Sequence, residues 1–155
     1  MDAIIIREAT PDDLEELLLF EQELITAERP MDPTIREGKL HYYPLEEWIG
    51  DPEIGLVVAE QNGKLVGSGY ARAKRARPYL DHEYYAYLGF MYTVPEYRGQ
   101  GVNRLIIEAL KGWARSRGLQ ELRLTVYDTN TPAMWAYEKA GFSKHILEMR
   151  MKDPL

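Results

Sequence analysis

The chain has 155 residues, of which 45% are hydrophobic and 28% are charged, a balance typical of one folded domain rather than of a disordered segment. It contains no cysteine, which excludes disulfides, thiolate metal sites and a cysteine acyl-enzyme. No apolar run approaches the roughly 20 residues of a membrane span, and the N-terminal residues lack the basic leader and apolar core of a signal peptide. We therefore expect a cytoplasmic protein that does not bind a membrane.

The net charge of −6 comes from one stretch of the chain, because residues 21–53 hold nine acids and three bases while the remainder balances. Such a run is usually a solvated helix and loop face, and the sharper alternative is a wall that attracts a cationic substrate. The overall acidity argues against nucleic-acid binding, despite the basic stretch at 72–77. His41, His82 and His145 are too scattered to predict a metal site.

In chain order, residues 3–8 predict a strand, and Thr10-Pro11-Asp12-Asp13 predicts the start of a helix. Thr10 suits the N-cap, and the acids suit the positive end of the helix. The apolar stripe of that helix is broken by Glu21, where another apolar residue is expected. Residues 29–52 contain four prolines and show no regular pattern except a short helical segment at 45–49.

Residues 56–61 and 64–71 predict two strands joined by Asn62-Gly63, a pair that favours a type I′ hairpin turn. Residues 84–94 are almost entirely apolar, which predicts a strand buried on both faces. Residues 121–127 and 142–151 predict two more strands, around a short helix at 131–140. The strongest predicted helix is 102–117, which ends before Gly118 and has an apolar stripe of Val102, Leu105, Ile106, Ala109, Leu110 and Trp113.

The order of these elements predicts an α/β fold, with a single mixed, mostly antiparallel sheet flanked by helices. We find no internal repeat, linker or low-complexity tract, so one domain is expected over residues 1–155.

The junction at residues 92–102, Tyr-Thr-Val-Pro-Glu-Tyr-Arg-Gly-Gln-Gly-Val, is the most informative segment. A buried strand ends at Pro95, a tight loop holds Gly99 and Gly101, and a helix begins at once. Glycines let an anion approach the backbone closely, and a helix N-terminus offers unpaired N–H groups and a partial positive charge. The segment favours a phosphate-binding loop, although a glycine turn that only joins strand to helix has the same appearance.

A second informative segment, residues 128–142, places a capped helix directly after a strand. Tyr137 follows Asn130 by about two helical turns. Taken alone, these residues also fit a core tyrosine and an asparagine that serves only as a cap.

Together, the two segments resemble the GCN5-related N-acetyltransferase (GNAT) family, over essentially the whole chain. The family pattern (Arg or Gln)-x-x-Gly-x-(Gly or Ala) falls on Arg98, Gly101 and position 103, where Asn103 departs from it. The later signature, Asn followed by a helix with Tyr-Glu-Lys-x-Gly-Phe, falls on Asn130 and residues 137–142. The resemblance implies an acyl-CoA N-acyltransferase fold, with a splay between the strands at 84–94 and 121–127.

The resemblance also implies an enzyme that moves an acetyl group from acetyl-CoA to a primary amine by direct attack in a ternary complex, with no metal. The pyrophosphate of coenzyme A would lie on the loop amides, and its pantetheine arm would follow the strand. One strand N–H would polarise the thioester carbonyl. The residues implied in cofactor binding are Met91, Tyr92, Thr93, Arg98, Gly99, Gln100, Gly101, Val102, Asn103 and Asn130.

For catalysis, the resemblance implies that Tyr137 donates a proton to the leaving thiolate. A phenol with a pKa of about 10 and a thiol of about 8.5 are roughly matched for this transfer. The family's catalytic Glu would fall at Tyr87, so the chain lacks it. Our candidate for the base is Glu83, acting through ordered water, because alternation along the strand places it on the face of Tyr85 and Tyr87. The open alternative is that Glu83 is only a surface turn residue.

For the acceptor, we predict a cationic small-molecule amine held by Tyr42, Tyr43 and Tyr85, whose ring faces suit ammonium groups. Two alternatives stay open: an N-acetyltransferase acting on protein amines, and a non-catalytic acyl-CoA-binding regulatory module, which would have no use for Tyr137. Dimers are frequent in the family, so a homodimer is a further expectation. No nucleic acid or membrane is expected as a partner.

Overall fold

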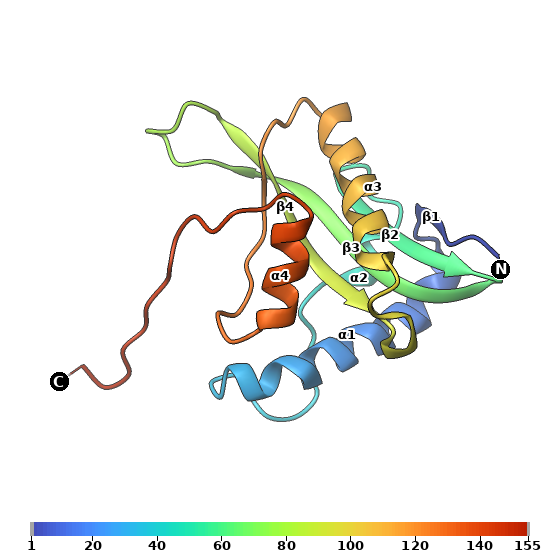
Figure 1. Ribbon diagram of the computed structural model, residues 1–155, viewed down its shortest axis with the longest axis horizontal. Coiled ribbons are helices and arrows are strands. Elements are labelled where there is room, and N and C mark those ends of the chain that lie inside the picture. The colour runs from blue at the N-terminus through green and yellow to red at the C-terminus, as the bar shows by residue number, and fades with distance from the viewer. Residues whose placement is uncertain (1, 155) are drawn as a thin grey trace. The chain divides into compact units, whose positions relative to one another are not determined.

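The computed structural model describes residues 2–154, in two compact units, Met1–Thr125 and Val126–Leu155, which we treat separately. The first unit contains a five-stranded sheet in which each strand pairs with the next along the chain (Figure 1). The first three pairings are antiparallel and the last is parallel, which confirms the predicted mixed, mostly antiparallel sheet. The strands are β1 (Ile5–Glu8), β2 (Ile54–Gln61), β3 (Lys64–Arg75), β4 (Tyr84–Thr93) and β5 (Leu122–Arg123).

Helices cover the sheet of the first unit, and no helix among residues 2–154 has the length and apolar character needed to cross a membrane. Short 3-10 turns precede and follow the first long helix, and another lies between β4 and the second long helix. The α-helices of this unit are α1 (Leu14–Glu28), α2 (Leu45–Trp48) and α3 (Val102–Ser116).

The β2–β3 hairpin has the predicted two-residue turn. Asn62 and Gly63 both have positive φ, 54° and 76°, as a type I′ turn requires. Strand β3 is longer than predicted, because residues 72–75 continue to pair with residues 84–87 of β4. Tyrosines on β4 contact two cations of this extension: the Lys74 Nζ lies 3.8 Å from the Tyr87 ring centroid, and the Arg75 guanidinium lies 5.1 Å from that of Tyr84.

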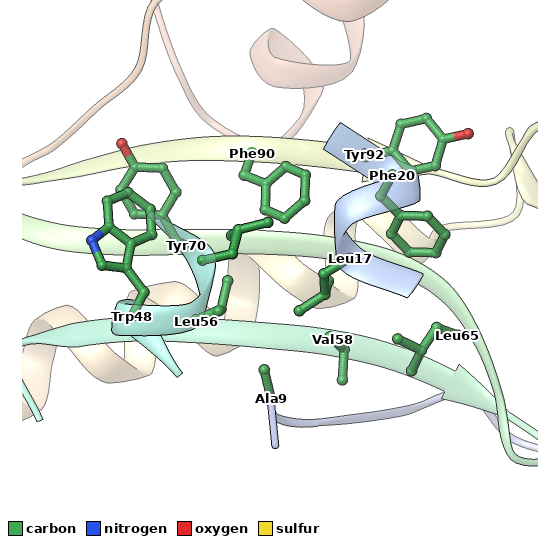
Figure 2. Packing of buried hydrophobic residues seen from close by; sticks show 11 residues of the cluster. Ala9, Leu17, Phe20, Trp48, Leu56, Val58, Leu65, Tyr70, Phe90 and Tyr92 are labelled. Carbon is green, nitrogen blue, oxygen red and sulfur yellow. The ribbon is translucent and has the colours of Figure 1, made fainter. Parts of the chain in front are cut away.

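An apolar cluster fills the space between the sheet and α1 and α2 (Figure 2). Tyr92 on β4 packs on Phe20 of α1 with ring centroids 4.8 Å apart, and Tyr70 on β3 packs on Trp48 of α2 at 4.5 Å. Burial of such large apolar side chains is the main favourable term in folding. The side chain of Phe90 lies within this cluster and is almost fully buried.

Helix α3 packs closely on β2 and β3, because glycines of these strands leave room for its side chains. A Cβ added at Gly69 of β3 would lie 2.6 Å from the Ile106 side chain, so this strand position has no room for one. The buried residues of α3 are Val102, Ile106, Ile107, Leu110 and Ala114.

The predicted stripe of α3 is wrong at Leu105, which is 41% exposed. The buried face follows i, i+4 spacing from Val102, and Leu105 lies beside that face rather than on it. Trp113 packs over Gly55 of β2, where an added Cβ would lie 2.7 Å from the indole ring.

A network of ion pairs joins β1, the start of α1 and β2. The Arg7 guanidinium donates to Asp13 at 2.7 and 3.0 Å and to Glu60 at 2.9 Å. Asp13 also accepts the N–H of Thr10 at 2.7 Å, in a capping box that confirms Thr10 as an N-cap. The hydrogen bond from Arg7 is the main reason that the pKa of Asp13 lies below its ordinary value. This carboxylate therefore stabilises the fold above the unfolded pKa of about 4, and the stabilisation is lost as the pH falls through the lower folded pKa.

Two predictions about the strands beside the splay need correction. Residues in β4 alternate between buried and half-buried, so the strand is not buried on both faces along its length. The strand predicted at 121–127 is reduced to Leu122–Arg123, because only these residues pair with β4.

The second unit contains one helix, α4 (Thr131–Lys139). The strand predicted at 142–151 is wrong, since none of these residues joins a strand in the described part of the chain. Their alternating apolar pattern gives strand propensity, but a strand also needs a neighbour that takes its backbone hydrogen bonds. Ile146, Leu147, Met149 and Met151 are 72–84% exposed.

Candidate active site

A bulge interrupts β4 at the strand segment implied in cofactor binding. Ser68 of β3 pairs with Tyr92 and Tyr70 pairs with Gly89, so Phe90 and Met91 together oppose a single residue of β3. Phe90 adopts a left-handed conformation with φ 53°, which is unusual for a bulky residue. The fully buried Ser68 hydroxyl donates to the Phe90 carbonyl at 2.9 Å and so holds the bulge in place.

Beyond the bulge, one edge of β4 is open. Strand β5 pairs only with Ala86 and Tyr87, and no other strand of the described chain pairs with that edge, which confirms the predicted splay. Val94 donates its N–H to Val66 of β3 at 2.9 Å, so the alternating amide of Thr93 points to the open edge. An extended ligand with amide groups, such as a pantetheine arm, can hydrogen-bond to such an edge as a further strand would.

The loop after β4 begins with a 3-10 turn at Pro95–Tyr97, which two hydrogen bonds hold in place. The Tyr97 hydroxyl donates to Gln61 at 2.9 Å, and the Arg98 N–H donates to the Pro95 carbonyl at 3.2 Å. The Arg98 guanidinium donates to the Thr93 carbonyl at 3.3 Å, which keeps this cation beside the end of β4. Because its amide is taken by the turn, Arg98 can contribute only its side chain to an anion.

The amides that follow Arg98 lie at the start of α3, where the first N–H groups have no acceptor within the helix. Gly101 is the N-cap residue with φ 86°, a conformation that glycine adopts readily. A Cβ added at Gly99 or Gly101 would meet nothing within 4 Å, so the space outside this backbone is open. The loop therefore fits a pyrophosphate on the amides of residues 99–103. Val102 is buried, and the side chain of Asn103 is half-buried rather than fully exposed.

The tyrosines predicted to hold the acceptor fall into two groups. Tyr43 belongs to the aromatic cluster, with its ring centroid 5.1 Å from Phe90 and 5.5 Å from Trp48, and burial raises the pKa of its hydroxyl. Tyr42 packs edge-on against Tyr43 at 5.8 Å. Tyr85 lies elsewhere, with the Arg123 guanidinium 4.0 Å from its ring centroid. One face of Tyr85 thus already binds a cation of the chain.

Glu83, the predicted base, lies at the end of the β3–β4 hairpin. Its side chain is 71% exposed, with its carboxylate 3.7 Å from the Arg75 guanidinium. Strand residues advance about 3.3 Å each, so Glu83 lies about 23 Å along the strand direction from Phe90. Neither observation tests the role of Glu83, which stays a prediction.

Sequence analysis did not recognise the role of Glu21, which is fully buried. Its carboxylate accepts the backbone N–H groups of Tyr42 and Tyr43 at 2.8 and 2.9 Å and lies 2.8 Å from His41 Nδ1. Buried carboxylates persist where hydrogen bonds compensate for lost hydration. Glu21 therefore holds residues 41–43, which we call the tyrosine segment, against α1. In the sequence, the signal for this contact was an acid in the apolar stripe of the helix.

In the second unit, both ends of α4 carry hydrogen-bonded caps. Asn130 accepts the Ala133 N–H at 3.3 Å, as expected of an N-cap. At the other end, Gly141 has φ 110° and donates to Glu138 at 3.1 Å, while Phe142 donates to the Tyr137 carbonyl at 3.0 Å. These two bonds form a Schellman motif.

The Schellman motif also positions the ring of Tyr137. The rings of Tyr137 and Phe142 meet edge-on with centroids 6.0 Å apart, which is the apolar contact that commonly accompanies this motif. The spacing Tyr-Glu-Lys-Ala-Gly-Phe is therefore a helix stop that fixes the tyrosine, a physical reading that sequence analysis missed. Among residues 2–154, no group of His, Asp and Glu side chains is arranged to hold a metal ion.

Comparison with known proteins links these features to one family. The model of the Acetyltransferase (GNAT) family matches residues 20–142. Thialysine N-epsilon-acetyltransferase from Bos taurus is 32% identical over 156 residues, covering 91% of this chain and 85% of that protein. Aminoglycoside N(6')-acetyltransferase type 1 from Klebsiella aerogenes is 30% identical over 110 residues, covering 69% and 70% of the two chains. Mycothiol acetyltransferase from Thermobispora bispora is 34% identical over 107 residues, and this chain spans only 34% of its length.

Solved structures show the same fold at low sequence identity. A tetramutant of the BH1408 protein from Bacillus halodurans has a TM-score of 0.85 at 20% identity, with 96% of this chain and 99% of that chain covered. A predicted acetyltransferase from Clostridium acetobutylicum, solved with acetyl-CoA, has a TM-score of 0.72 at 17% identity, with 97% and 96% covered.

The glycine loop generates a binding prediction. Replacing Gly101 by Glu adds bulk, a strained φ and a negative charge beside the amides, so the affinity for acetyl-CoA should fall at least about tenfold, or about 1.4 kcal/mol. Calorimetric titration measures this change. Gly118→Glu is the matched control, because Gly118 also has positive φ, 71°, but follows the C-terminal end of α3. Unchanged affinity in a folded Gly101→Glu variant would exclude the loop from the binding site.

Proposed function

This chain belongs to the acetyltransferase (GNAT) family, and from that premise we propose that it transfers an acetyl group from acetyl-CoA to the primary amine of a small cationic molecule. Acetyl-CoA is the co-substrate that the family implies. The observation that carries the proposal is the bulged, open edge of β4 leading directly into the Gly101 loop. This arrangement offers backbone amides to an extended arm and to a pyrophosphate in one continuous stretch of chain.

We propose a single acyltransferase domain over residues 1–155. The family model supports this, since its match runs through the boundary between the two units. Each unit holds part of the family pattern: unit one holds the β4 edge and the loop, and unit two holds Asn130 and Tyr137.

In the proposed reaction, the loop amides and Arg98 bind the pyrophosphate, and the amides of Met91 and Thr93 bind the arm. An N–H near the bulge donates to the thioester oxygen as negative charge develops there, a contribution worth about 3 to 4 kcal/mol in comparable oxyanion sites. The neutral amine attacks the carbonyl carbon, the C–N bond forms and the C–S bond breaks. Tyr137 gives its proton to the thiolate and recovers one from the attacking nitrogen through water.

The nature of the relatives supports a cationic acceptor. Two of them are named for acetylation of aminoglycosides, which carry several amines, and of thialysine, an amino acid with a second ammonium group and a carboxylate. The acidic stretch at 21–53 and the Tyr42–Tyr43 pair agree with such a substrate. Acetylation of protein amines and a regulatory module without catalysis are the alternatives. The predicted cytoplasmic location, the homodimer and the role of Tyr85 stay predictions.

Tyr137 provides the first test of catalysis. If it is the proton donor, Tyr137→Phe should lower kcat by about 10²-fold or more and leave the affinity for acetyl-CoA nearly unchanged. Steady-state rates of thiol release measure kcat, and calorimetry measures the affinity. A Phe variant with full turnover would show that the thiolate obtains its proton elsewhere and that Tyr137 only packs against Phe142.

A matched pair of amines tests the substrate class. The diamine 1,5-diaminopentane and lysine differ only in the α-carboxylate of lysine. The diamine should have the higher kcat/KM, and its kcat/KM should fall as salt rises, because salt screens exposed charges beyond about 8 Å at physiological ionic strength. If lysine is preferred, the acidic stretch faces solvent, and the basic residues at 72–77 become the better candidates for recognition.

A further inference from the structure

Lys74, near the end of β3, has a half-buried side chain that extends toward the bulge in β4. In the register of the sheet, Lys74 pairs with Tyr85, yet its Nζ lies 3.8 Å from the ring centroid of Tyr87. Tyr87 is two residues nearer to the bulge than Tyr85 is. The lysine side chain therefore runs along the sheet in the direction of the residues proposed to bind acetyl-CoA.

The ring in contact with Lys74 bridges β4 and β5 at the point where these two strands separate. Tyr87 pairs with Arg123, the last residue of β5. The Tyr87 hydroxyl lies 2.9 Å from the hydroxyl of Thr125, which follows the end of that strand. Strand residues advance about 3.3 Å each, so Tyr87 lies about 10 Å before Phe90 along β4. Lys74 therefore lies over the start of the open edge of β4.

Aromatic contacts connect Lys74 to the tyrosines predicted to hold the acceptor. The ring centroid of Tyr87 is 6.5 Å from that of Tyr70, and the Tyr70 centroid is 5.5 Å from that of Tyr43. Tyr43 belongs to the tyrosine segment, and its ring also packs on Phe90 at the bulge, with centroids 5.1 Å apart. The amine of Lys74 is therefore on the face of the sheet where an external amine is proposed to bind.

Lys74 has no acidic partner that would hold it in its charged form. No Asp or Glu among residues 2–154 forms an ion pair with it. The nearby charges are cations: Arg72 on the same strand, and Arg123 of β5, which lies over Tyr85. Burial lowers the pKa of Lys74, and the charge of Arg72 lowers it further. The fraction of free amine, which is the nucleophilic form, is therefore larger than in an exposed lysine.

We propose that the chain acetylates its own Lys74 when no external amine is bound. The proposal rests on the acetyl-CoA site of the proposed function. There, the arm runs from the loop after β4 back along Thr93 and Met91, so its acetyl end is directed toward Tyr87. Lys74 approaches the same point from the opposite direction on a flexible four-carbon stem. The transfer occurs within one molecule, because the donor site and the lysine lie on two paired strands.

The atoms and charges of this transfer balance. The Lys74 ammonium first releases one proton to solvent. The free amine then attacks the carbonyl carbon, the N–C bond forms, the C–S bond breaks, and the second proton lost by nitrogen ends on the thiolate. The products are a neutral acetyl-lysine, free coenzyme A and one proton. Loss of the charge ends the interaction of Lys74 with the Tyr87 ring, so that ring face becomes available to an external ammonium group.

Peptide mass spectrometry with isotope-labelled acetyl-CoA tests the proposal, because the label distinguishes new acetyl groups from any acquired during expression. The native chain is incubated at neutral pH in a buffer without amines. Label should appear on Lys74 at least about tenfold faster than on Lys64, an exposed lysine at the β2–β3 turn, because only Lys74 lies beside the donor site. The rate constant should not depend on protein concentration, since the transfer occurs within one molecule.

Two variants separate this transfer from chemical acetylation in solution. Gly101→Glu weakens the donor site, so at low acetyl-CoA concentration it should slow labelling of Lys74 by about the same factor as its loss of affinity and leave labelling of Lys64 unchanged. Lys74→Arg keeps a cation over Tyr87 and should abolish the single equivalent of coenzyme A that the native chain releases without an amine. Circular dichroism confirms that both variants are folded.

Two outcomes overturn the inference while the proposed function stands. One is acetylation of 1,5-diaminopentane or lysine by a chain whose Lys74 takes up no label. The other is labelling of Lys74 that only equals that of Lys64, or that grows in proportion to protein concentration. Label on Lys74 without acetylation of either amine would instead overturn the proposed small-molecule acceptor and support self-acetylation.

Discussion

The hydrogen bond from the Ser68 hydroxyl to the Phe90 carbonyl is the constraint on which the arrangement of the site depends. A bulky residue at positive φ costs about 1–3 kcal/mol, so the bulge persists only because its surroundings hold it. The Phe90 ring is buried in the aromatic cluster with its centroid 5.1 Å from that of Tyr43, and its carbonyl accepts the Ser68 hydroxyl. One distorted residue therefore joins the open edge of β4, the core and the tyrosine segment.

The tyrosines of β4 interact with cations of the chain itself. Three cations of the chain lie over tyrosine rings: Lys74 over Tyr87, Arg75 over Tyr84 and Arg123 over Tyr85. These ring faces are already used, so they add little to recognition of an external ammonium group.

Local signals in the sequence predicted the parts of the fold that are stabilised locally. Asn62-Gly63 set the hairpin turn, Thr10 set a helix start, and the apolar period of 102–117 set α3, because each depends on neighbours within a few residues. The predicted apolar stripe of α3 was wrong at Leu105, because packing against the sheet decides which face of the helix is buried. The strand predicted at 142–151 failed for a related reason, because pairing depends on a partner that propensity does not reveal.

The residues of the candidate site also differ in how far the sequence reveals them. Gly101 could be singled out on physical grounds, because glycines at a helix start favour anion binding. Tyr137 could be singled out only through the family signature, and the structure then showed that its segment is a helix stop. The bulge at Phe90 has no local signal, because neither a glycine nor an asparagine marks the left-handed position. Glu21 had a signal, an acid in an apolar stripe, but its contact with the tyrosine segment depends on how the irregular residues 29–44 return to α1.

Hydrogen–deuterium exchange with and without acetyl-CoA tests the central claim most directly, since it reads backbone amides one segment at a time. We expect acetyl-CoA to slow exchange in two segments, residues 99–103 of the loop and residues 89–93 of β4, and to leave the C-terminal end of α3 unaffected. Binding that is measurable by calorimetry but leaves both segments unprotected would contradict a donor site built from this loop and this strand edge.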